Sequence, residues 1–454
     1  MTGPAGLSYH GALAALSERG RFGIRLGLGR TRALLHGLGD PQHAVRGALV
    51  GGTNGKGSVL ALADSALRAA GYRVGTTPKP HLVTYRERIC IDGRPIEPDD
   101  FARLVGAVLP VADRVARRLG QPTEFELLTA VVFASFAEAR PDLALVEVGL
   151  GGRLDATHAW DGGVAAITNV DLDHMDRLGD TVVAIAREKA AIIERGDVAV
   201  TGARGDGLAV ILRRARRVGA PLTEVVPAPL LGWDRDGIDV ELPRLGRTRV
   251  GLRGRHQAAN AATADALLDA LEAAGIATVG WDARRQGYAS AVWPGRLELL
   301  SIGGRDVLLD GAHNPAGAAA LAVALDDLRP FLVDGPVTFV TAAMGDKDVD
   351  GIVAALAGTG GASTLLDATI VCTSLDLPRS MPAGDLAARW LVGRSATARG
   401  GIVVEADPIA AVDRAVAAAR GPVVVAGSLY LVGAARGHLV DDPDLRDPDP
   451  IEDR

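Results

Sequence analysis

The sequence has 454 residues, too many for a single hydrophobic core, and this length predicts two or three domains. Hydrophobic residues make up 48% of the chain, so a packed protein is expected and wholesale disorder is not. A net charge of −6 argues against a broad nucleic-acid surface, and the lack of about 18 consecutive uncharged apolar residues argues against a membrane span.

Short apolar runs, Gly-rich turns and Ala-rich helical patterns alternate along the chain, which predicts an α/β fold of βαβ units with mainly parallel sheets. Buried strands are expected, in chain order, at 48–50, 143–148, 164–169, 198–200, 306–309, 337–341, 368–372 and 423–426. A Gly-rich loop after the first strand leads into a helix expected over 59–70. The pattern at 225–252 predicts short strands forming a small antiparallel insertion at the edge of the first domain.

The domain boundary is expected at 286–296, where Gly, Pro and aromatic residues interrupt this alternation. We therefore predict a larger domain over 1–290 and a smaller one over 291–440. The acidic, Pro-rich segment 441–454 is expected to form a flexible tail.

Cysteine usage and the first residues predict the cellular compartment. Cys90 and Cys372 are the only cysteines and have no partner motif, which argues against a disulfide framework or a thiolate metal site. The first twenty residues lack the basic start and continuous apolar stretch of a secretory signal. Both observations favour the cytoplasm.

Lysine is scarce in this chain. Of the 49 basic residues only four are lysines, so 45 are arginines. The four are Lys56, Lys79, Lys189 and Lys347. An amine is a compact charge that can be deprotonated or modified, whereas a guanidinium cannot. These lysines are therefore candidates for specific chemistry.

The segment GGTNGKGS at 51–58 follows a predicted strand and opens a predicted helix. Its glycines permit close approach of the backbone to phosphate, the helix N-terminus favours an anion, and Lys56 supplies a mobile cation. The strict Walker spacing is absent, because Val50 occupies the first glycine position and Gly57 follows the lysine. The pattern predicts a nucleotide-phosphate site, with a structural turn as the alternative.

Two polar residues lie at the exits of later strands, where doubly wound sheets collect their ligands. Glu147 ends an apolar strand, and a buried carboxylate there needs a cation. His174 follows another apolar strand. Together they predict a site for Mg²⁺ or Mn²⁺ holding ATP phosphates, although a lone histidine could equally be structural.

Lys189 lies among apolar residues at helical spacing. It could be a solvated helix lysine paired with Glu188. Alternatively, a desolvated amine reacts with CO₂ to form a carbamate, which converts a cation into an anionic metal ligand. Arginine cannot react in this way.

Eight motifs occur in the order typical of folylpolyglutamate synthase/dihydrofolate synthases of the Mur ligase superfamily, which the chain resembles. They are GTNGKGS, EVGLGGRLDAT, DHMDRLGDT with REKAAII, RHQAANA, WPGRLE, DGAHNP, GDKD and GSLYLVG. The opening FGIRLGLGRTRALL is similar too, so the resemblance covers nearly the whole chain. It implies an N-terminal Mur-type P-loop domain, a C-terminal Rossmann-like domain, and ATP between them.

The resemblance also implies roles for individual residues. Expected ATP contacts are Thr53, Asn54, Gly55, Lys56, Gly57, Ser58, Asn260, Arg296 and Asp310. Expected Mg²⁺ ligands are Glu147, His174 and a carbamylated Lys189, with an additional K⁺ left open, and expected catalytic residues are Lys56, Lys189 and His313. Expected substrate contacts, in part a pterin site, are Lys79, Pro122, Thr123, Glu124, Phe125, Leu154, Asp155 and Ala156. From the residues alone, Arg296 and Asp310 could instead form an ion pair between domains.

Two positions depart from the family pattern. His158 replaces the asparagine of the usual DATN segment, and Lys79 replaces the magnesium-binding serine of the usual TSPHL segment. An ammonium at a metal position would repel the metal. We therefore expect Lys79 to turn toward phosphate or a carboxylate, with Thr77 or water at the metal. An exposed loop shaped by the flanking prolines is the alternative.

The resemblance implies an ATP-dependent ligation. A folate-type carboxylate, from tetrahydrofolate or dihydropteroate, attacks the γ-phosphate of ATP, and the amine of L-glutamate then attacks the acyl phosphate. The expected partners are small molecules, not nucleic acid or membrane, and a monomer is expected. The alternatives are a Mur-superfamily ligase for a different acid or amine, and a nucleotide-binding regulator without metal chemistry.

Overall fold

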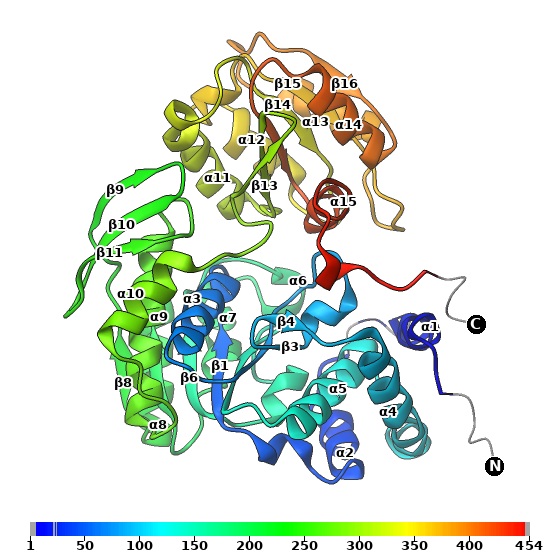
Figure 1. Cartoon of the computed structure of the whole chain (residues 1–454), viewed down its shortest axis with the longest axis vertical. Coiled ribbons are helices and arrows are strands. Elements are labelled where there is room, and N and C mark those ends of the chain that lie inside the picture. Colours follow the sequence, from blue (N-terminus) through cyan, green and yellow to red (C-terminus); the bar gives the residue numbers. More distant parts are fainter. Residues whose placement is uncertain (1–5, 21–22, 24, 450–454) are drawn as a thin grey trace. The chain divides into compact units, whose positions relative to one another are not determined.

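A computed structural model of the chain describes residues 6–20, 23 and 25–449 (Figure 1). Residues 22 and 24 of the opening family motif, and residues 450–454 of the acidic tail, lie outside this description. The chain packs as two units. The first comprises Met1–Ala228, Ala259–Ser290 and Asp444–Arg454, and the second comprises Pro229–Ala258 and Ala291–Pro443.

The first unit is built on an eight-stranded sheet that is parallel except at one edge. In sheet order its strands are β4 (Arg94–Pro95), β3 (Cys90–Ile91), β2 (Val74–Thr77), β5 (Leu143–Glu147), β1 (Gly47–Gly51), β6 (Gly163–Ile167), β7 (Val198–Thr201) and β8 (Leu222–Glu224). The central strands are buried on both faces, as continuous Val, Leu and Ala runs require. The four strands predicted for this part are confirmed.

Helices cover both faces of this sheet, and Figure 1 shows α4 and α5 on one side of β1 and α3, α9 and α10 on the other. The helices are α1 (Tyr9–Gly20), α2 (Gly29–Gly37), α3 (Lys56–Ala69), α4 (Pro98–Leu119), α5 (Glu124–Ala139), α6 (Met175–Leu178), α7 (Val182–Ala190), α8 (Gly205–Val218), α9 (Gln257–Ala273) and α10 (Trp281–Ser290). Single turns form at η1 (Pro41–Ala44), η2 (Tyr85–Arg88), η3 (Ala156–Ala159) and η6 (Pro443–Leu445).

Two local features fix helices of the first unit. Helix α5 begins at a reciprocal capping box between Thr123 and Glu126. Helix α10 packs closely on α3, since a Cβ on Gly287 would lie 2.3 Å from the Cα of Ala66. Helix α3 itself confirms the helix predicted after the Gly-rich loop, and it begins three residues earlier than expected.

The second unit contains a six-stranded sheet that is parallel apart from its first strand. In sheet order its strands are β12 (Glu298–Ile302), β13 (Arg305–Asp310), β17 (Val423–Ala426), β14 (Thr338–Thr341), β15 (Thr369–Cys372) and β16 (Ile402–Val404). The four strands predicted here are also confirmed.

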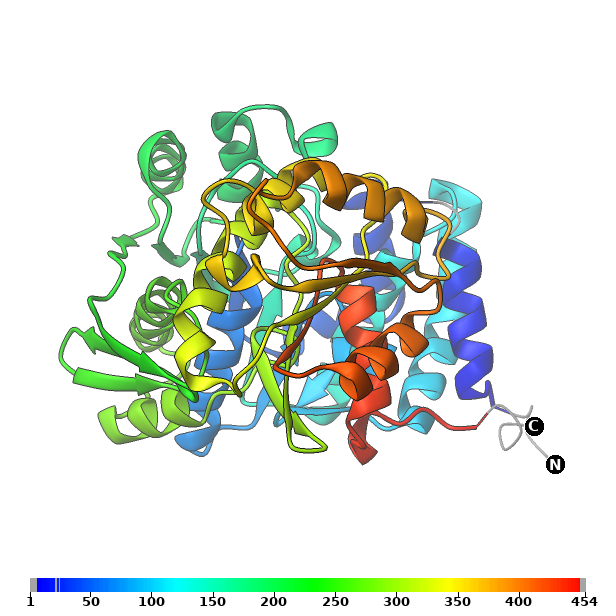
Figure 2. The same ribbon diagram turned by 90° about the horizontal axis from the view of Figure 1, so that it is seen from above.

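Helices flank this second sheet, and Figure 2 shows α14 and α15 beside its strands. They are α11 (Pro315–Leu328), α12 (Val349–Ala357), α13 (Ala383–Gly393), α14 (Pro408–Ala418) and α15 (Leu429–Leu439), with single turns η4 (Arg329–Phe331) and η5 (Ser363–Leu365). The core under α11, α12 and α13 contains Phe339 packed against Trp390 with ring centroids 5.5 Å apart.

The segment expected as an insertion in the first domain forms an antiparallel sheet but belongs to the second unit. Its strands are β9 (Leu230–Asp234), β10 (Gly237–Leu242) and β11 (Gly246–Val250). Arg235 donates to both carboxylate oxygens of Asp306, and the indole of Trp233 donates to the carbonyl of Asp327 at 3.2 Å. These long-range bonds connect the antiparallel segment to the second unit. The periodicity of its strands does not reveal them. The contact boundary between the units also falls after Ser290.

The acidic tail is a second correction, because its described part is not free. Turn η6 lies within it, and Asp447 accepts a hydrogen bond from the Thr84 hydroxyl at 2.6 Å. An acidic, Pro-rich segment is expected to be disordered only if it has no binding partner in the fold. Here the buried guanidinium of Arg86 binds the Asp447 carboxylate.

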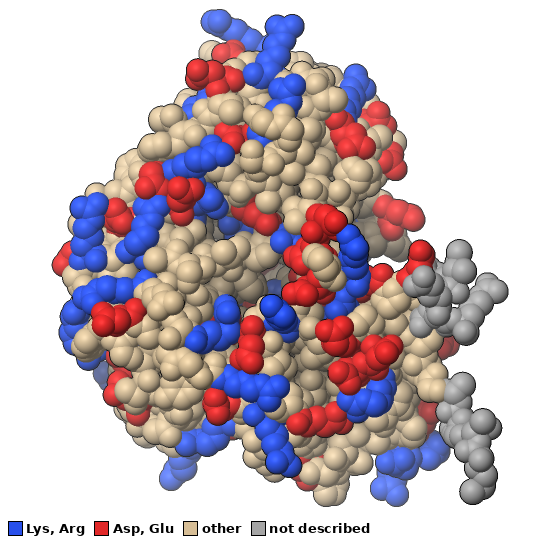
Figure 3. Space-filling view, viewed as in Figure 1, with Lys and Arg blue, Asp and Glu red and all other residues tan. Residues whose placement is uncertain are grey.

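The helices and one face of the surface can be compared with the hydropathy and charge of the chain. No helix among the described residues is long and apolar enough to cross a membrane. On the face shown in Figure 3, Lys and Arg are interspersed with Asp and Glu and do not form one continuous basic patch.

Candidate active site at the carboxyl ends of the central strands

The loop between β1 and α3 depends on glycine at two positions. Gly52 and Gly55 have φ values of 146° and 81°, in the region that favours glycine. A Cβ on Gly52 would lie 1.9 Å from the Thr168 hydroxyl, and one on Gly55 would lie 2.3 Å from the Asn260 amide oxygen. The loop is therefore clamped between the end of β6 and helix α9, and the predicted Asn260 is brought against it.

A second clamp comes from Asn169, which sequence reasoning did not single out although it ends the strand expected at 164–169. Its side-chain oxygen accepts from the backbone amides of Thr53 and Asn54 at 3.2 and 2.9 Å. The Thr168 hydroxyl donates to the Asn54 carbonyl at 2.6 Å. These bonds hold the loop before α3, whose first amides lack intrahelical acceptors and favour an anion.

Three of the four lysines meet at this loop. The amines of Lys56 and Lys189 donate to the same carbonyl oxygen, that of Gly52, at 3.2 and 2.8 Å. The amine of Lys79 donates to the carbonyl of Glu147 at 2.6 Å. Lys56 also lies 4.0 Å from the Glu147 carboxylate. Lys56 and Lys79 thus contact Glu147, Lys56 and Lys189 share the Gly52 carbonyl, and three amines converge at the carboxyl ends of β1 and β5, which favours a polyanion.

Lys189 is buried, with 5% of its surface exposed. Burial, with a smaller effect from the charge of Lys56, lowers its pKa to about 7 against the opposing effects of Asp173 and Asp155. Glu188, the partner in the solvated-helix alternative, instead bonds Arg153 at 2.9 Å. That alternative is wrong, and the side chain is a desolvated amine at the edge of the loop.

Oxygen ligands suited to a divalent cation lie beside these lysines. Glu147 is 3% exposed, and its carboxylate accepts from the Lys79 backbone amide at 3.0 Å. Thr77 lies at the end of the adjacent strand β2, and its buried hydroxyl has no hydrogen-bond partner among the described residues. His174 is exposed, caps α6 with a φ of 49°, and lies 3.9 Å from Asp173. Within 6–449 no three His, Cys, Asp or Glu side chains form a ready metal cluster.

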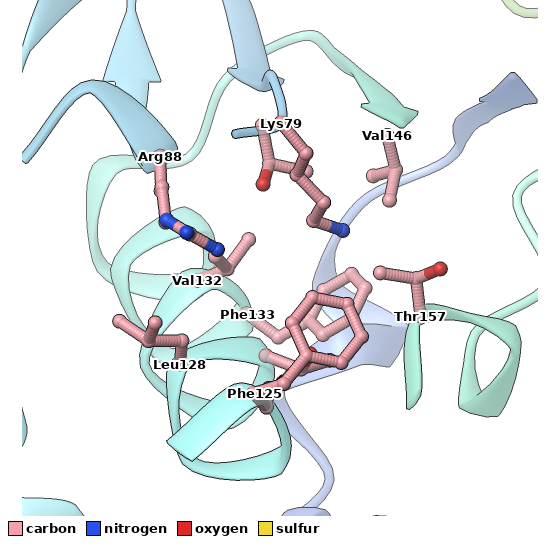
Figure 4. Close-up of a pocket in the computed structure, with 10 residues that line it drawn as sticks. Lys79, Arg88, Phe125, Leu128, Val132, Phe133, Val146 and Thr157 are labelled. Atoms are coloured by element: carbon pink, nitrogen blue, oxygen red, sulfur yellow. Dashed lines mark hydrogen bonds between the residues drawn. The ribbon is translucent and has the colours of Figure 1, made fainter. Parts of the chain in front are cut away.

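The Lys79 side chain does not project from an exposed loop. Its amine lies 4.7 Å from the centre of the Phe125 ring, and burial lowers its pKa to about 8, opposed by Asp155 and Glu147. Figure 4 shows Lys79 and Arg88 extending toward the pocket that Phe125 closes. The lining residues are Thr77, Lys79, Arg88, Phe125, Leu128, Thr129, Val132, Phe133, Val146 and Thr157.

Of the predicted substrate contacts, Phe125 and Lys79 line this pocket, and the others do not line it. Asp155 is buried and accepts from the Leu150 amide at 2.7 Å and from the Thr157 hydroxyl at 2.5 Å, so it shapes the loop after β5. Thr123 is a helix cap, and Glu124 accepts from the Tyr85 hydroxyl at 3.0 Å. Pro122, Leu154 and Ala156 lie on the same two loops. Arg88 and Thr157 were missed, since neither stood out in its motif.

The remaining predicted residues cluster in the second unit. Asp310 ends β13 and accepts from the amides of Leu297 and Ala312, each at 2.9 Å. Burial raises its pKa, and Arg296 opposes this. A Cβ on Gly311 would lie 1.9 Å from the Arg296 guanidinium, so this glycine makes room for it. His313 contacts the Gly311 carbonyl at 2.8 Å. Arg296 and Asp310 belong to one unit, which excludes the ion pair between domains.

The clamped Gly-rich loop, the helix behind it and the converging lysines define a Mur-type, ATP-dependent ligase. The family model "Mur ligase middle domain" matches residues 50–218, and "Dihydrofolate synthetase, C-terminal domain" matches residues 298–436. A dihydrofolate synthase/folylpolyglutamate synthase from Bacillus subtilis is 36% identical, over 84% of this chain and 88% of that protein. The chain belongs to the dihydrofolate synthase/folylpolyglutamate synthase family.

Solved structures agree. A Mycobacterium tuberculosis folylpolyglutamate synthase complexed with ADP and AMPPCP matches with a TM-score of 0.82 and 33% identity, over 95% of this chain and 100% of that one. A bifunctional folylpolyglutamate synthase/dihydrofolate synthase from Yersinia pestis, complexed with AMPPNP and Mn ion, matches with a TM-score of 0.80 and 30% identity, over 97% and 100%. The two-unit α/β fold is that of this family.

Proposed function

We propose that this enzyme uses ATP to join L-glutamate to a folate-type carboxylate, as a folylpolyglutamate synthase, a dihydrofolate synthase or both. The observation that carries the proposal is the meeting of Lys56, Lys79 and Lys189 around the Gly-rich loop and Glu147. The chain has only four lysines, and three of them meet here. Such a cluster of cations can stabilise the charge on a phosphoryl group during its transfer.

The reaction has two steps. An oxygen of the acceptor carboxylate attacks the γ-phosphorus of ATP and ADP leaves, forming an acyl phosphate. The amine of L-glutamate then attacks the acyl carbon, phosphate leaves, and the amine loses a proton to form the amide. No protein nucleophile is needed, so the chain contributes position, charge and exclusion of water.

Different residues of the first unit would bind the phosphates, hold the Gly-rich loop and contact the pterin. The amides at the start of α3 and the Lys56 amine would bind the β- and γ-phosphates. Asn169 and Asn260 would act indirectly, by holding the loop in its phosphate-binding form. Phe125 would face the pterin ring, with Lys79 beside it. In the second unit, Arg296, Asp310 and His313 would contact ATP.

The oxygen donors at this site fit Mg²⁺. The orphaned Thr77 hydroxyl and the buried Glu147 carboxylate provide two hard ligands at neighbouring strand ends, and His174 would provide a third. A bound Mg²⁺ supplies Lewis-acid neutralisation of phosphate charge. A carbamate on Lys189 would place a further carboxylate there, and its low pKa provides the neutral amine that carbamate formation needs.

We also propose a cytoplasmic location. The substrates would be ATP, glutamate and reduced folates, and the two cysteines, Cys90 and Cys372, are buried free thiols that suit a reducing compartment.

Steady-state ATP turnover tests the function. Dihydropteroate, tetrahydrofolate and an unrelated aromatic carboxylate would each be supplied with L-glutamate and Mg²⁺. We expect turnover that needs both glutamate and one of the two pterin acids. Equal turnover with the unrelated acid, or none with either pterin, would contradict the proposal.

A further inference from the structure

The short turn η2 contributes one residue to the wall of the pocket formed around Lys79 and Phe125, here called the Lys79–Phe125 pocket. Its last residue, Arg88, lines that pocket and donates to His81 at 2.8 Å. The His81 ring packs against the Tyr85 ring at a tilt of 39°, with centroids 4.2 Å apart. The position of η2 therefore sets the position of a cationic wall of the pocket.

The same turn contains a buried cation that points the other way. Arg86 is 3% exposed, and its guanidinium donates to the Ile96 carbonyl, the Arg446 carbonyl and the Asp447 carboxylate at 3.0, 2.8 and 3.3 Å. Two of these three acceptors belong to the C-terminal tail. A buried guanidinium without its acceptors is costly, so the tail is part of what holds Arg86 in place.

The cap of η2 is bonded to the same carboxylate. Thr84 caps the turn, accepting from the Arg86 amide at 3.3 Å, and its hydroxyl donates to Asp447 at 2.6 Å. Because that hydroxyl has one proton, the Tyr9 hydroxyl at 3.0 Å must be the donor to Thr84. The opposite arm of the cap is Glu87, which accepts from the Thr84 amide at 2.7 Å.

We propose that Asp447 is a positioning residue for the Lys79–Phe125 pocket, which would bind the pterin acid. Asp447 holds η2 so that Arg88 faces this pocket. This inference rests on the proposed function for the identity of the acceptor. The acidic tail then has a functional role in the first unit. Its residue Asp447 is 361 positions from Arg86 in the sequence, and its carboxylate bonds the turn η2 beside the pocket. Removing its carboxylate should loosen Arg88 and leave the Gly-rich loop untouched.

The test compares Asp447→Ala with Asp449→Ala, a neighbouring tail acid outside the network. For Asp447→Ala we expect the KM of the pterin acid to rise roughly three- to tenfold, the size of one ordinary hydrogen bond because the effect on the pocket is indirect, with the KM of ATP unchanged. Asp447→Asn keeps one acceptor oxygen, so its KM for the pterin acid should lie between those of the wild type and Asp447→Ala. An unchanged pterin KM, or equal rises for ATP and pterin, would overturn the proposal.

Hydrogen exchange separates this proposal from the function. In Asp447→Ala the amides of Leu82, Val83 and Thr84, which all donate to Glu87, should exchange faster, whereas Asp449→Ala leaves them unchanged. Wild-type protein that turns over no pterin acid refutes the proposed function. Unchanged exchange in Asp447→Ala refutes the positioning role by itself.

Discussion

Replacing Lys189 by arginine tests the chemistry of the buried amine. Arginine keeps the positive charge and the donor to the Gly52 carbonyl, but it cannot form a carbamate. We expect Lys189→Arg to lose ligation as completely as Lys189→Ala. Because a single preorganised charge near a reacting group is worth roughly 100- to 1000-fold in kcat, the loss should be of that size.

The structure also sets the cost to stability. The pKa of Lys189 falls from 10.5 to about 7, mainly by burial, which corresponds to about 5 kcal/mol against the charged form. Arginine stays charged at all working pH values, so Lys189→Arg carries that penalty, whereas the neutral Lys189→Met does not. Lys189→Met should therefore fold as well as the wild type and still fail to ligate.

The assay measures ligation and thermal unfolding for each variant, with Arg187→Met as the control. Arg187 lies on the same helix α7 but is exposed, so its replacement should change neither quantity. Added acetate should partly restore Lys189→Ala by supplying a carboxylate. Near-normal turnover of Lys189→Arg would remove the carbamate from the mechanism.

Three further predictions follow from the contacts. Lys79→Ser should raise the KM of the pterin acid more than that of ATP, since the amine lies over Phe125; equal effects on both would contradict this. Arg296→Ala should weaken ATP use while pterin binding, followed by fluorescence, stays intact; the reverse pattern would show that the sites are misassigned. Burial, with a smaller effect from Asp161, raises the pKa of Asp197 to about 7, so between about pH 4 and 7 the folded state holds a proton that the unfolded state lacks, and stability from this group falls as pH rises. Asp197→Asn should therefore raise the free energy of unfolding by at most about 4 kcal/mol at pH 8 and by less than half of that at pH 5; equal gains at both pH values would refute it.

Local pattern was enough to predict the strands and the phosphate loop. Buried parallel strands are continuous apolar runs, and all eight expected strands are present. The scarcity of lysine pointed to a site, and three of its four lysines meet there. Both signals are local in sequence or composition.

What the sequence did not reveal depends on long-range partners. The antiparallel segment joins the second unit through bonds such as Arg235 to Asp306, 71 residues away. The described part of the tail is held by Arg86, which composition could not identify as its partner. Asn169 and Arg88 lie within or near recognised motifs, yet their roles follow from where their side chains point. Lys79 was expected to face phosphate or a carboxylate; its amine lies close enough to the Asp155 and Glu147 carboxylates for both to raise its pKa, and it bonds the Glu147 backbone carbonyl beside the Phe125 ring.

The central claim is that an acceptor carboxylate is activated by ATP before glutamate is joined to it. The most direct measurement uses a pterin acid with ¹⁸O in its carboxylate, together with ATP, Mg²⁺ and L-glutamate, and follows the label by mass spectrometry. Attack on the γ-phosphorus predicts one ¹⁸O in the released phosphate and one in the new amide. Unlabelled phosphate formed alongside the amide product would contradict the account.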